Sequence, residues 1–75
     1  MTDRDPLFEE AARRVVSSVT ASTSSLQRVY GIGYNRAGKI MDQLEACGIV
    51  GPSQGGKPRA VLVDPMELEN ILASV

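Results

Sequence analysis

Histidine is absent from this 75-residue chain, and cysteine occurs once, at Cys47. A single thiol cannot form an internal disulfide, and it leaves too few ligands for a zinc finger or a histidine-ligated metal site. The lack of an imidazole also removes the acid–base and nucleophilic catalysis that depends on one. We therefore expect neither a metal centre nor a cofactor in this chain.

Aromatic residues and long hydrophobic runs are also scarce. Only Phe8, Tyr30 and Tyr34 are aromatic, so the core must be aliphatic. No apolar run is long enough to span a bilayer and no signal-peptide pattern is present, which predicts a soluble, intracellular protein. The GxxxxGK(S/T) loop of nucleotide hydrolases is missing too. An apolar fraction of 43% is ordinary for a globular protein, so residues 1–75 are expected to form one small domain.

The net charge of −1 conceals three segments of different sign. Residues 1–12 and residues 60–75 each carry a net charge of −3, whereas residues 13–59 carry seven bases against two acids, a net charge of +5. Charge that is segregated in this way gives a positive face to a nominally acidic domain, as a nucleic-acid-binding protein needs. Bases that are merely solvated would give the same pattern, so charge alone leaves both interpretations open.

Apolar residues at helical spacing predict a first helix over residues 6–19. Asp5 is the expected N-cap and Pro6 the first helical residue, where its missing N–H costs nothing. The expected buried face consists of Leu7, Phe8, Ala11, Ala12, Val15, Val16 and Val19. Residues 1–4 are polar and are expected to be frayed.

Residues 20–25 contain no large apolar group and are expected to connect the first helix to a second one over residues 24–30. The expected inward-facing residues of the second helix are Leu26, Val29 and Tyr30. Thr23 or Ser24, followed by Gln27, resembles a capping box at its start. A helix N-terminus also suits a phosphate, so Ser24 has two compatible roles.

Gly31-Ile32-Gly33 is the expected turn into a third helix over residues 34–47, which Gly48 would end. The apolar side of this helix consists of Ala37, Ile40, Met41 and Leu44. Its other side carries mostly Asn35, Arg36, Lys39 and Gln43. A short helix behind a glycine turn, apolar inside and polar outside, is what a DNA recognition helix needs. Gly38 lowers the stability of the helix, and it either permits a close backbone approach or has no function.

Residues 49–50 and 59–63 are predicted strands, joined by a glycine- and proline-rich tip over residues 51–58. They would form a β-hairpin wing, with which a short strand near residues 20–22 could pair. Asp64, Pro65 and Glu67 then predict the capped start of a last helix over residues 65–74. Its expected apolar face consists of Met66, Leu68, Ile71, Leu72 and Val75.

The predicted fold is α+β but mainly α. It is a winged helix-turn-helix with a three-helix core over about residues 6–64, a small β-hairpin wing and an extra C-terminal helix. In such a fold the third helix would enter the major groove of double-stranded DNA.

The segments SSLQR (residues 24–28), IGYNRA (32–37) and EACGIV (45–50) form a specific combination. Together they resemble the C-terminal gamma domain of the FtsK/SpoIIIE DNA translocases, over about residues 6–64. The resemblance implies sequence-specific binding of short, G-rich, polarised octamers, which orients a chromosome translocase during segregation and cell division. It also implies contact with, and activation of, a tyrosine site-specific recombinase. The hexameric, membrane-anchored, ATP-driven motor would lie outside this chain, and this domain would be its cytoplasmic end, without membrane contact.

The family's base-reading positions fall here on Asn35, Arg36 and Lys39. Arginine can bond bidentately to guanine O6 and N7, and asparagine to adenine N6 and N7. The expected contacts to the DNA backbone are Ser24, Gln27, Arg28, Gln43, Lys57 and Arg59. This chain departs from the family at Gly38, where alanine is usual, and at Lys39, where arginine is usual and whose side chain lacks the planar fork. The capped helix after Val63 is a third departure.

Two other functions share the winged-helix fold. A protein-interaction module would dock through the wing or the last helix, and the acidic termini favour it mildly. A free-standing transcriptional regulator would need a dimerising element, which only the last helix could supply. An enzyme is the weakest interpretation, because the Asp42 and Glu45 carboxylates have no nucleophile beside them and are expected to form exposed surface.

Overall fold

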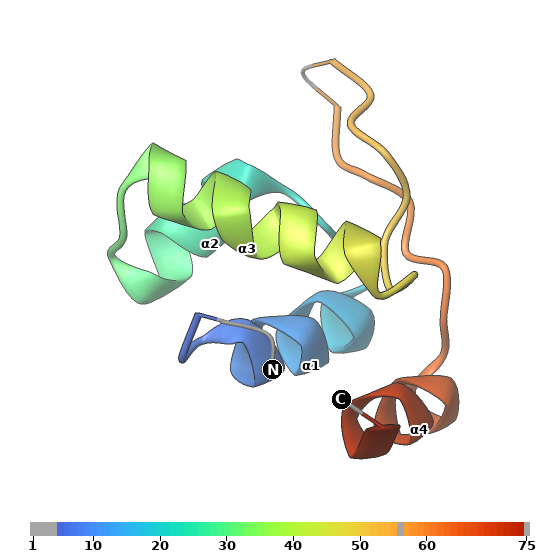
Figure 1. Ribbon diagram of the computed structural model, residues 1–75. Coiled ribbons are helices and arrows are strands. Elements are labelled where there is room, and N and C mark those ends of the chain that lie inside the picture. The colour runs from blue at the N-terminus through green and yellow to red at the C-terminus, as the bar shows by residue number, and fades with distance from the viewer. Residues whose placement is uncertain (1–4, 56, 75) are drawn as a thin grey trace.

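The computed structural model describes residues 5–55 and 57–74, and within them it contains four helices. They are α1 (Phe8–Ser18), α2 (Thr23–Tyr30), α3 (Tyr34–Ala46) and α4 (Pro65–Ser74). All four predicted helices are confirmed, with ends that differ by at most two residues. α2 packs against α3, and α1 packs against both α3 and α4, so that α1 lies between them (Figure 1). The residues 1–4 expected to be frayed, and Val75 of the last apolar face, lie outside the described residues.

The core that joins these helices is mainly aliphatic, as the scarcity of aromatic residues predicted, but it includes Phe8. The four residues on the predicted apolar side of α3 are completely buried, and Leu26 anchors α2 against them. Burial of one leucine side chain contributes about 1.5–3 kcal/mol relative to exposure. The buried residues are Phe8, Ala11, Ala12, Val15, Val16, Ala21, Leu26, Ala37, Ile40, Met41, Leu44, Ile49, Val50 and Leu68.

Three residues that were predicted to face the core are exposed instead. Val19 is 74% exposed because it follows the end of α1, and Met66 is 76% exposed in the first turn of α4. Val29 is 40% exposed, because α2 is two turns long and packs chiefly against α3, which covers only a narrow stripe around Leu26. Helical spacing places a residue on a face, but the neighbouring elements decide how wide the covered stripe is.

α1 begins two residues later than predicted. Leu7 rather than Asp5 is the N-cap, and Phe8 rather than Pro6 is the first helical residue. The Asp5 carboxylate accepts the Leu7 N–H at 2.9 Å, and the Asp5 carbonyl accepts the Phe8 N–H at 2.8 Å. Residues 5–8 therefore form a turn ahead of the helix, and this turn places the Asp5 carboxylate beside Arg36 of α3.

Left-handed residues end three of the helices. Gly31 (φ +62°) follows α2 and Gly48 (φ +75°) follows α3, as their glycines predicted, whereas Gly33 has an ordinary φ of −75°. After α3 the N–H groups of Gly48 and Ile49 bond back into the last turn at 2.9 and 3.0 Å, the pairing of a Schellman motif. α1 ends in the same way at Val19 (φ +54°), a conformation that is uncommon for a β-branched residue.

The cap of α2 is Ser22, not Thr23 or Ser24 as predicted. The Ser22 backbone is extended, and its hydroxyl accepts the Ser25 N–H at 3.0 Å. Because Ser22 takes the capping role, Ser24 stands exposed in the first helical turn.

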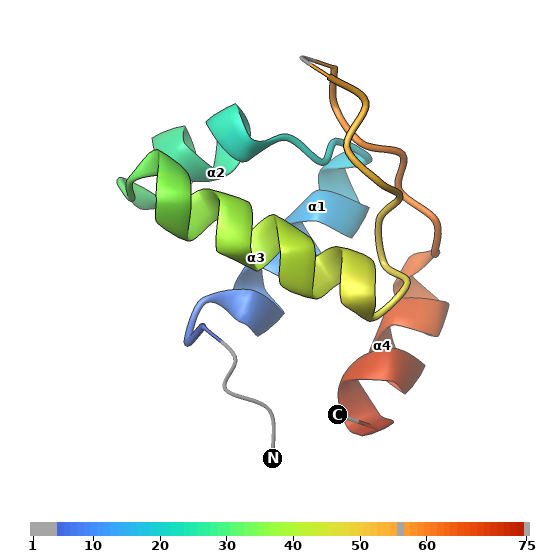
Figure 2. The ribbon, with the colours of Figure 1, turned by 45° about the horizontal axis from the view of Figure 1, so that its top comes forward.

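The segment after α3 contains isolated antiparallel bridges in place of the two predicted strands. Val50 pairs with Val61, and Gln54 pairs with Lys57 near the tip. Ala21 pairs with Arg59, where the Arg59 N–H donates to the Ala21 carbonyl at 2.7 Å, which agrees with the short pairing segment expected near residues 20–22. Prolines at positions 52 and 58 lack the N–H that a continuous ladder needs. We refer to residues 50–61 as the tip loop (Figure 2).

α4 has the predicted capping box. The Glu67 N–H donates to the Asp64 carboxylate at 2.7 Å, and the Asp64 N–H donates to the Glu67 carboxylate at 3.0 Å. Leu68 is buried against the core, and Arg13 of α1 bonds both Glu9 and Glu69, which links α1 to α4. Among residues 5–55 and 57–74, none of the helices combines the length and the apolar character that crossing a bilayer requires.

Candidate nucleic-acid interface

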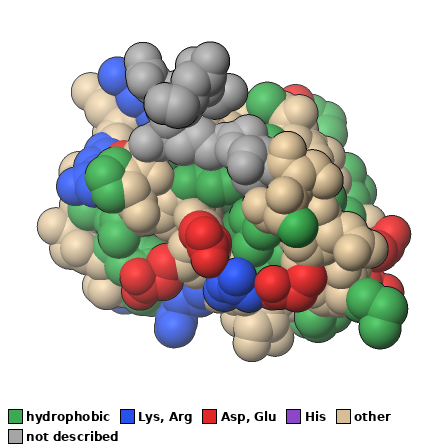
Figure 3. All heavy atoms as spheres, turned by 60° about the horizontal axis from the view of Figure 1, so that its bottom comes forward, with side chains coloured by type: hydrophobic (Ala, Val, Ile, Leu, Met, Phe, Trp, Pro, Cys, Tyr) green, Lys and Arg blue, Asp and Glu red, His purple; other side chains and the backbone are tan. Residues whose placement is uncertain are grey.

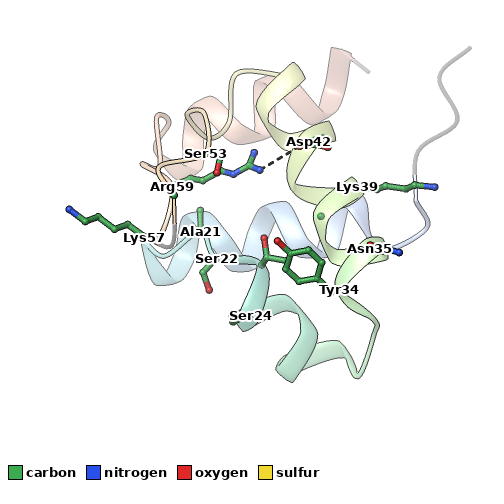
Figure 4. A pocket seen from close by; sticks show the side chains of 13 residues that line it. Ala21, Ser22, Ser24, Tyr34, Asn35, Lys39, Asp42, Ser53, Lys57 and Arg59 are labelled. Carbon is green, nitrogen blue, oxygen red and sulfur yellow. Dashed lines mark hydrogen bonds and ion pairs between the residues drawn. The ribbon is translucent and has the colours of Figure 1, made fainter.

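A hollow of about 630 Å³ lies between α3, the start of α2 and the tip loop (Figure 4). The α3 part of its lining is the polar side of the helix, and the tip loop supplies two cations. The lining residues are Ala21, Ser22, Thr23, Ser24, Tyr34, Asn35, Gly38, Lys39, Asp42, Ser53, Gly55, Lys57 and Arg59. Five of the nine predicted DNA-contacting residues therefore gather at one hollow: Ser24, Asn35, Lys39, Lys57 and Arg59.

Asn35 and Lys39 are four residues apart on α3, so their side chains project in the same direction (Figure 4). Both are exposed, as is Lys57 on the tip loop. Within the described part of the chain, neither lysine takes part in an ion pair. Their ammonium groups are therefore available to an anion such as phosphate.

Arg36 lies outside the hollow, at another edge of α3, where it pairs with Asp5. Its Nε donates to Asp5 Oδ2 at 2.8 Å, and its Nη2 donates to Asp5 Oδ1 at 3.0 Å. The Arg36 side chain is 47% exposed, whereas that of Asp5 is only 13% exposed. The hydrogen bond from Arg36 lowers the pKa of the Asp5 carboxyl below its ordinary value, although burial opposes this, and the same bond raises the pKa of Arg36.

Gln43 lies near the same edge of α3 as Arg36. Its side-chain oxygen accepts the Asp5 backbone N–H at 3.2 Å. Two predicted DNA-contacting residues of α3 thus hold the segment that leads into α1. Contacts of this kind, 31 and 38 residues apart in sequence, fix the position of Asp5 relative to the outer side of α3.

Arg59 reaches from the tip loop to α3. Its guanidinium donates to the Met41 carbonyl at 3.4 Å, to Glu45 at 3.3 Å and to Asp42 at 3.4 Å. The side chain is 13% exposed. These contacts fasten the base of the tip loop to α3 and offset the negative charges of Asp42 and Glu45, the carboxylates that were the weak case for catalysis.

Gln27 and Arg28 of α2 do not line the hollow. Gln27 is half-buried and Arg28 is exposed, so Arg28 offers its charge on a separate part of the surface. Within residues 5–55 and 57–74, no group of three or more His, Cys, Asp or Glu side chains is placed to hold a metal ion.

Tyr34 is the main lining residue that the sequence reasoning missed. It opens α3, is 68% exposed and lies toward Ser22 and Ser24 (Figure 4). The helical spacing that placed Asn35 outside could have identified it. No local signal could have identified the contacts of Asp5 with α3, because Arg36 and Gln43 lie 31 and 38 residues away in the sequence.

Gly38 lines the hollow, and a Cβ built on it would meet no heavy atom within 4 Å. The close backbone approach that was one explanation for this glycine is therefore absent within the described structure. The missing side chain leaves open space on the outer side of α3 instead.

Comparison with known proteins gives a match to the family described as "Ftsk gamma domain" over residues 2–64. The chain is similar to the DNA translocase FtsK of Lactococcus lactis subsp. lactis, with 56% identity over 81% of this chain and 8% of the relative. It is also similar to the DNA translocase FtsK of Chlorobaculum tepidum (56% identity; 87% and 8% of the two chains) and of Mycobacterium tuberculosis (48%; 99% and 10%).

The chain spans only 8–10% of the length of these relatives. The family match, in contrast, extends over most of the 75 residues and includes α1, α2, α3 and the tip loop. This chain therefore belongs to the Ftsk gamma domain family.

Proposed function

We propose that residues 1–75 form a winged helix-turn-helix domain that binds double-stranded DNA, with α3 in the major groove and the tip loop as the wing. The observation that carries the proposal is the hollow, where Asn35 and Lys39 of α3 share one lining with the tip-loop cation Lys57. In such a protein–DNA complex, the amide and cationic side chains of the helix bind the base edges, and a flanking loop contacts the phosphates.

The proposed base readers are Asn35, Arg36 and Lys39, each exposed on α3. The proposed contacts to the DNA backbone are Ser24, Gln27, Arg28, Gln43, Lys57 and Arg59. Two of the latter already hold other parts of the chain, because Gln43 accepts the Asp5 N–H and Arg59 bonds α3. They would contribute through the geometry that they impose as much as through direct contact.

The charge on the rest of the surface supports this orientation. α1 carries charges of both signs and α4 only acidic ones, and Arg13 of α1 lies between Glu9 and Glu69. The side of the molecule that faces the reader in Figure 3 has acidic and basic side chains next to each other rather than one positive field. Phosphate attraction would therefore act mainly at α3 and the tip loop.

The proposed target is a short, G-rich, polarised sequence. The domain would read the orientation of this sequence for a hexameric motor during chromosome segregation and cell division. Its relatives are named DNA translocases, which supports a role on DNA. Activation of a tyrosine site-specific recombinase would be a second task of the same domain. The motor and its membrane anchor would belong to the rest of the parent protein.

A gel-shift comparison tests this function. The chain is titrated against a duplex that carries a G-rich octamer and against a scrambled duplex of equal composition, at two salt concentrations. We expect tighter binding of the G-rich duplex at both salts and weaker binding of both duplexes at the higher salt. Equal affinity for the two duplexes would contradict sequence-specific binding.

A protein-interaction module is the second candidate, and one observation favours it. Leu62 and Met66, close together in sequence before and within α4, are 56% and 76% exposed. A contiguous exposed apolar patch that included these two side chains would mark a protein contact. If the chain bound no duplex even at low salt but retained a recombinase-type partner, this second function would replace the first.

A further inference from the structure

Tyr34 is the one aromatic side chain among the described residues that line the hollow, and the DNA contacts proposed above do not include it. It is the first residue of α3 and is 68% exposed. Tyr30, the last residue of α2, is instead half-buried and packs against the core. Of the two tyrosines the core therefore uses Tyr30, and the packing of the fold does not account for Tyr34.

The direction of the Tyr34 side chain differs from that of the proposed base readers in the hollow. Figure 4 shows it turned toward Ser24 at the start of α2, whereas Lys39 projects away from α2. In a helix-turn-helix the first helix of the pair crosses the DNA backbone, and the second lies in the major groove. With α2 and α3 as this pair, a side chain of α3 that is turned toward α2 would face the sugar-phosphate strand at the edge of the groove.

The Tyr34 hydroxyl makes no hydrogen bond to a described residue, and neither does the hydroxyl of Ser24. The Ser22 hydroxyl, in contrast, accepts the Ser25 N–H at 3.0 Å as the cap of α2. A tyrosine hydroxyl can donate one hydrogen bond and is uncharged at neutral pH. Tyrosine and serine hydroxyls are regular donors to phosphate oxygens in protein–DNA complexes, so both groups are suited to the DNA backbone.

We propose that Tyr34 is a further DNA-contacting residue, whose hydroxyl donates to one backbone phosphate of the strand that passes the start of α2. The inference rests on the proposed function, in which α3 enters the major groove. A hydrogen bond is directional, so this contact would fix the position of the domain along the strand. The Lys57 ammonium, in contrast, attracts phosphates of any duplex over a distance that salt limits.

Salt dependence separates these two kinds of phosphate contact. A lysine that neutralises a phosphate releases counterions, whereas an uncharged hydroxyl releases none. Loss of the Tyr34 hydroxyl should therefore lower the affinity by the same factor at every salt concentration. Because a phosphate carries no sequence information, this factor should also be equal for the G-rich and the scrambled duplex.

The test variant is Tyr34→Phe, which removes only a hydroxyl from an exposed side chain, so its circular dichroism spectrum should match that of the wild type. Tyr30→Phe is the matched control, because it removes the same group from a tyrosine that does not line the hollow. For Tyr34→Phe we expect the affinity for both duplexes to fall about 5- to 20-fold, as the loss of one hydrogen bond to a charged group predicts, with the salt slope of the wild type. Tyr30→Phe should bind like the wild type.

A scan of the G-rich duplex with single methylphosphonate linkages locates the phosphate, because each linkage is uncharged. At one linkage the substitution should weaken binding of the wild type and have a clearly smaller effect on Tyr34→Phe. Changes that remove the same contact are not additive, whereas changes at separate contacts are. At linkages contacted by Lys57, the effects of the methylphosphonate and of Tyr34→Phe should therefore add.

The possible failures are distinguishable. If the wild-type chain binds neither duplex even at low salt, the proposed function fails and this inference falls with it. If the wild type binds and Tyr34→Phe has the same affinity, only the contact of the Tyr34 hydroxyl is overturned. A loss in Tyr34→Ala that is absent in Tyr34→Phe would likewise overturn it, because the ring rather than the hydroxyl would then contact DNA.

The identity of the DNA group is tested separately. A loss in Tyr34→Phe that is confined to the G-rich duplex would overturn the phosphate contact in favour of a base contact. Additive effects at every methylphosphonate linkage would also contradict it, because no single phosphate would then share its contact with Tyr34.

Discussion

Arg36 of α3 and Arg59 of the tip loop bind carboxylates at different edges of α3, and they use different edges of their guanidinium groups. Arg59 uses Nη1 and Nη2, the end edge, for the Met41 carbonyl, Glu45 and Asp42, and its side chain is 13% exposed. Arg36 uses its side edge for Asp5 and is 47% exposed. The same residue type thus fastens a loop in one place and, in the other, leaves its end edge without a hydrogen bond to a described residue.

Under the proposed function, this difference would let one helix both hold the tip loop and read bases. Arg59 fixes the tip loop to α3, so the position of Lys57 relative to the outer side of α3 is defined. Arg36 and its neighbour Asn35 remain exposed on the first turn of α3. Substitutions at the two edges should therefore have separable effects, the first on the fold and the second on base preference.

The largest expected effect is that of Arg36→Ala on specificity. Loss of one bidentate contact to guanine should lower the discrimination between the G-rich and scrambled duplexes about 5- to 140-fold, while the helical circular dichroism spectrum is unchanged. Arg36→Lys keeps the charge but lacks the fork, so most of the discrimination should stay lost. Competition binding measures both values, and an undiminished ratio in Arg36→Lys would show that charge alone suffices.

Arg59→Ala should act on stability instead. It removes a largely buried side chain that bonds a backbone carbonyl and two carboxylates, so the free energy of unfolding should fall by about 1–2 kcal/mol. Affinity for both duplexes should fall together because the tip loop loses its anchor. Urea denaturation measures the free energy of unfolding. A loss of affinity for the G-rich duplex alone would contradict a purely structural role for Arg59.

Gly38→Ala is expected to stabilise the chain by up to about 1 kcal/mol, since alanine favours a helix and nothing lies within 4 Å of the added Cβ. The midpoint of thermal unfolding should rise accordingly. Binding to the G-rich duplex should be nearly unchanged, because a methyl group fits the open hollow. If Gly38→Ala instead weakens DNA binding strongly, the DNA approaches α3 more closely than this account requires.

Lys57→Ala should have a uniform effect. Loss of one phosphate contact lowers the slope of log affinity against log salt by about one unit, equally for the G-rich and scrambled duplexes. A salt titration gives both slopes. A change of slope for only one of the two duplexes would indicate that Lys57 contacts a base rather than a phosphate.

The smallest expected effect is the pH dependence of the Asp5 contact. Because the pKa of Asp5 is lowered in the folded chain, the contact with Arg36 should be complete above the ordinary carboxyl pKa and should be lost as pH falls through the lowered one. An NMR titration of the Asp5 carboxyl carbon should therefore show a midpoint below 3.8 in the wild type and a higher one in Arg36→Ala. Identical midpoints would mean that Arg36 does not hold Asp5 in solution.

Local features of the sequence predicted the helices well. Spacing located the buried side of α3, and the Asp64 and Glu67 pair predicted the cap of α4, because each signal lies within one or two turns. The errors come from tertiary context. The turn at Asp5 displaced the start of α1, and Val19 and Met66 lie where no neighbouring element covers them.

The candidate site shows the same division. Helical spacing was enough to place Asn35 and Lys39 together on the outside of α3. The partners of Arg36 and Arg59 could not be predicted from local sequence patterns, because they lie 31 and 14 to 18 residues away in the sequence. Which edge of a guanidinium is free depends on such long-range contacts, and no periodicity encodes it.

Methylation interference tests the central claim most directly. Guanine N7 atoms of the G-rich duplex are methylated sparsely, and the bound and free fractions are compared for the wild type and for Arg36→Ala. We predict that methylation of at least one guanine excludes the duplex from the wild-type complex, and that this interference disappears in Arg36→Ala. Wild-type binding that is indifferent to N7 methylation, or an identical pattern in both proteins, would contradict base reading by Arg36 in the major groove.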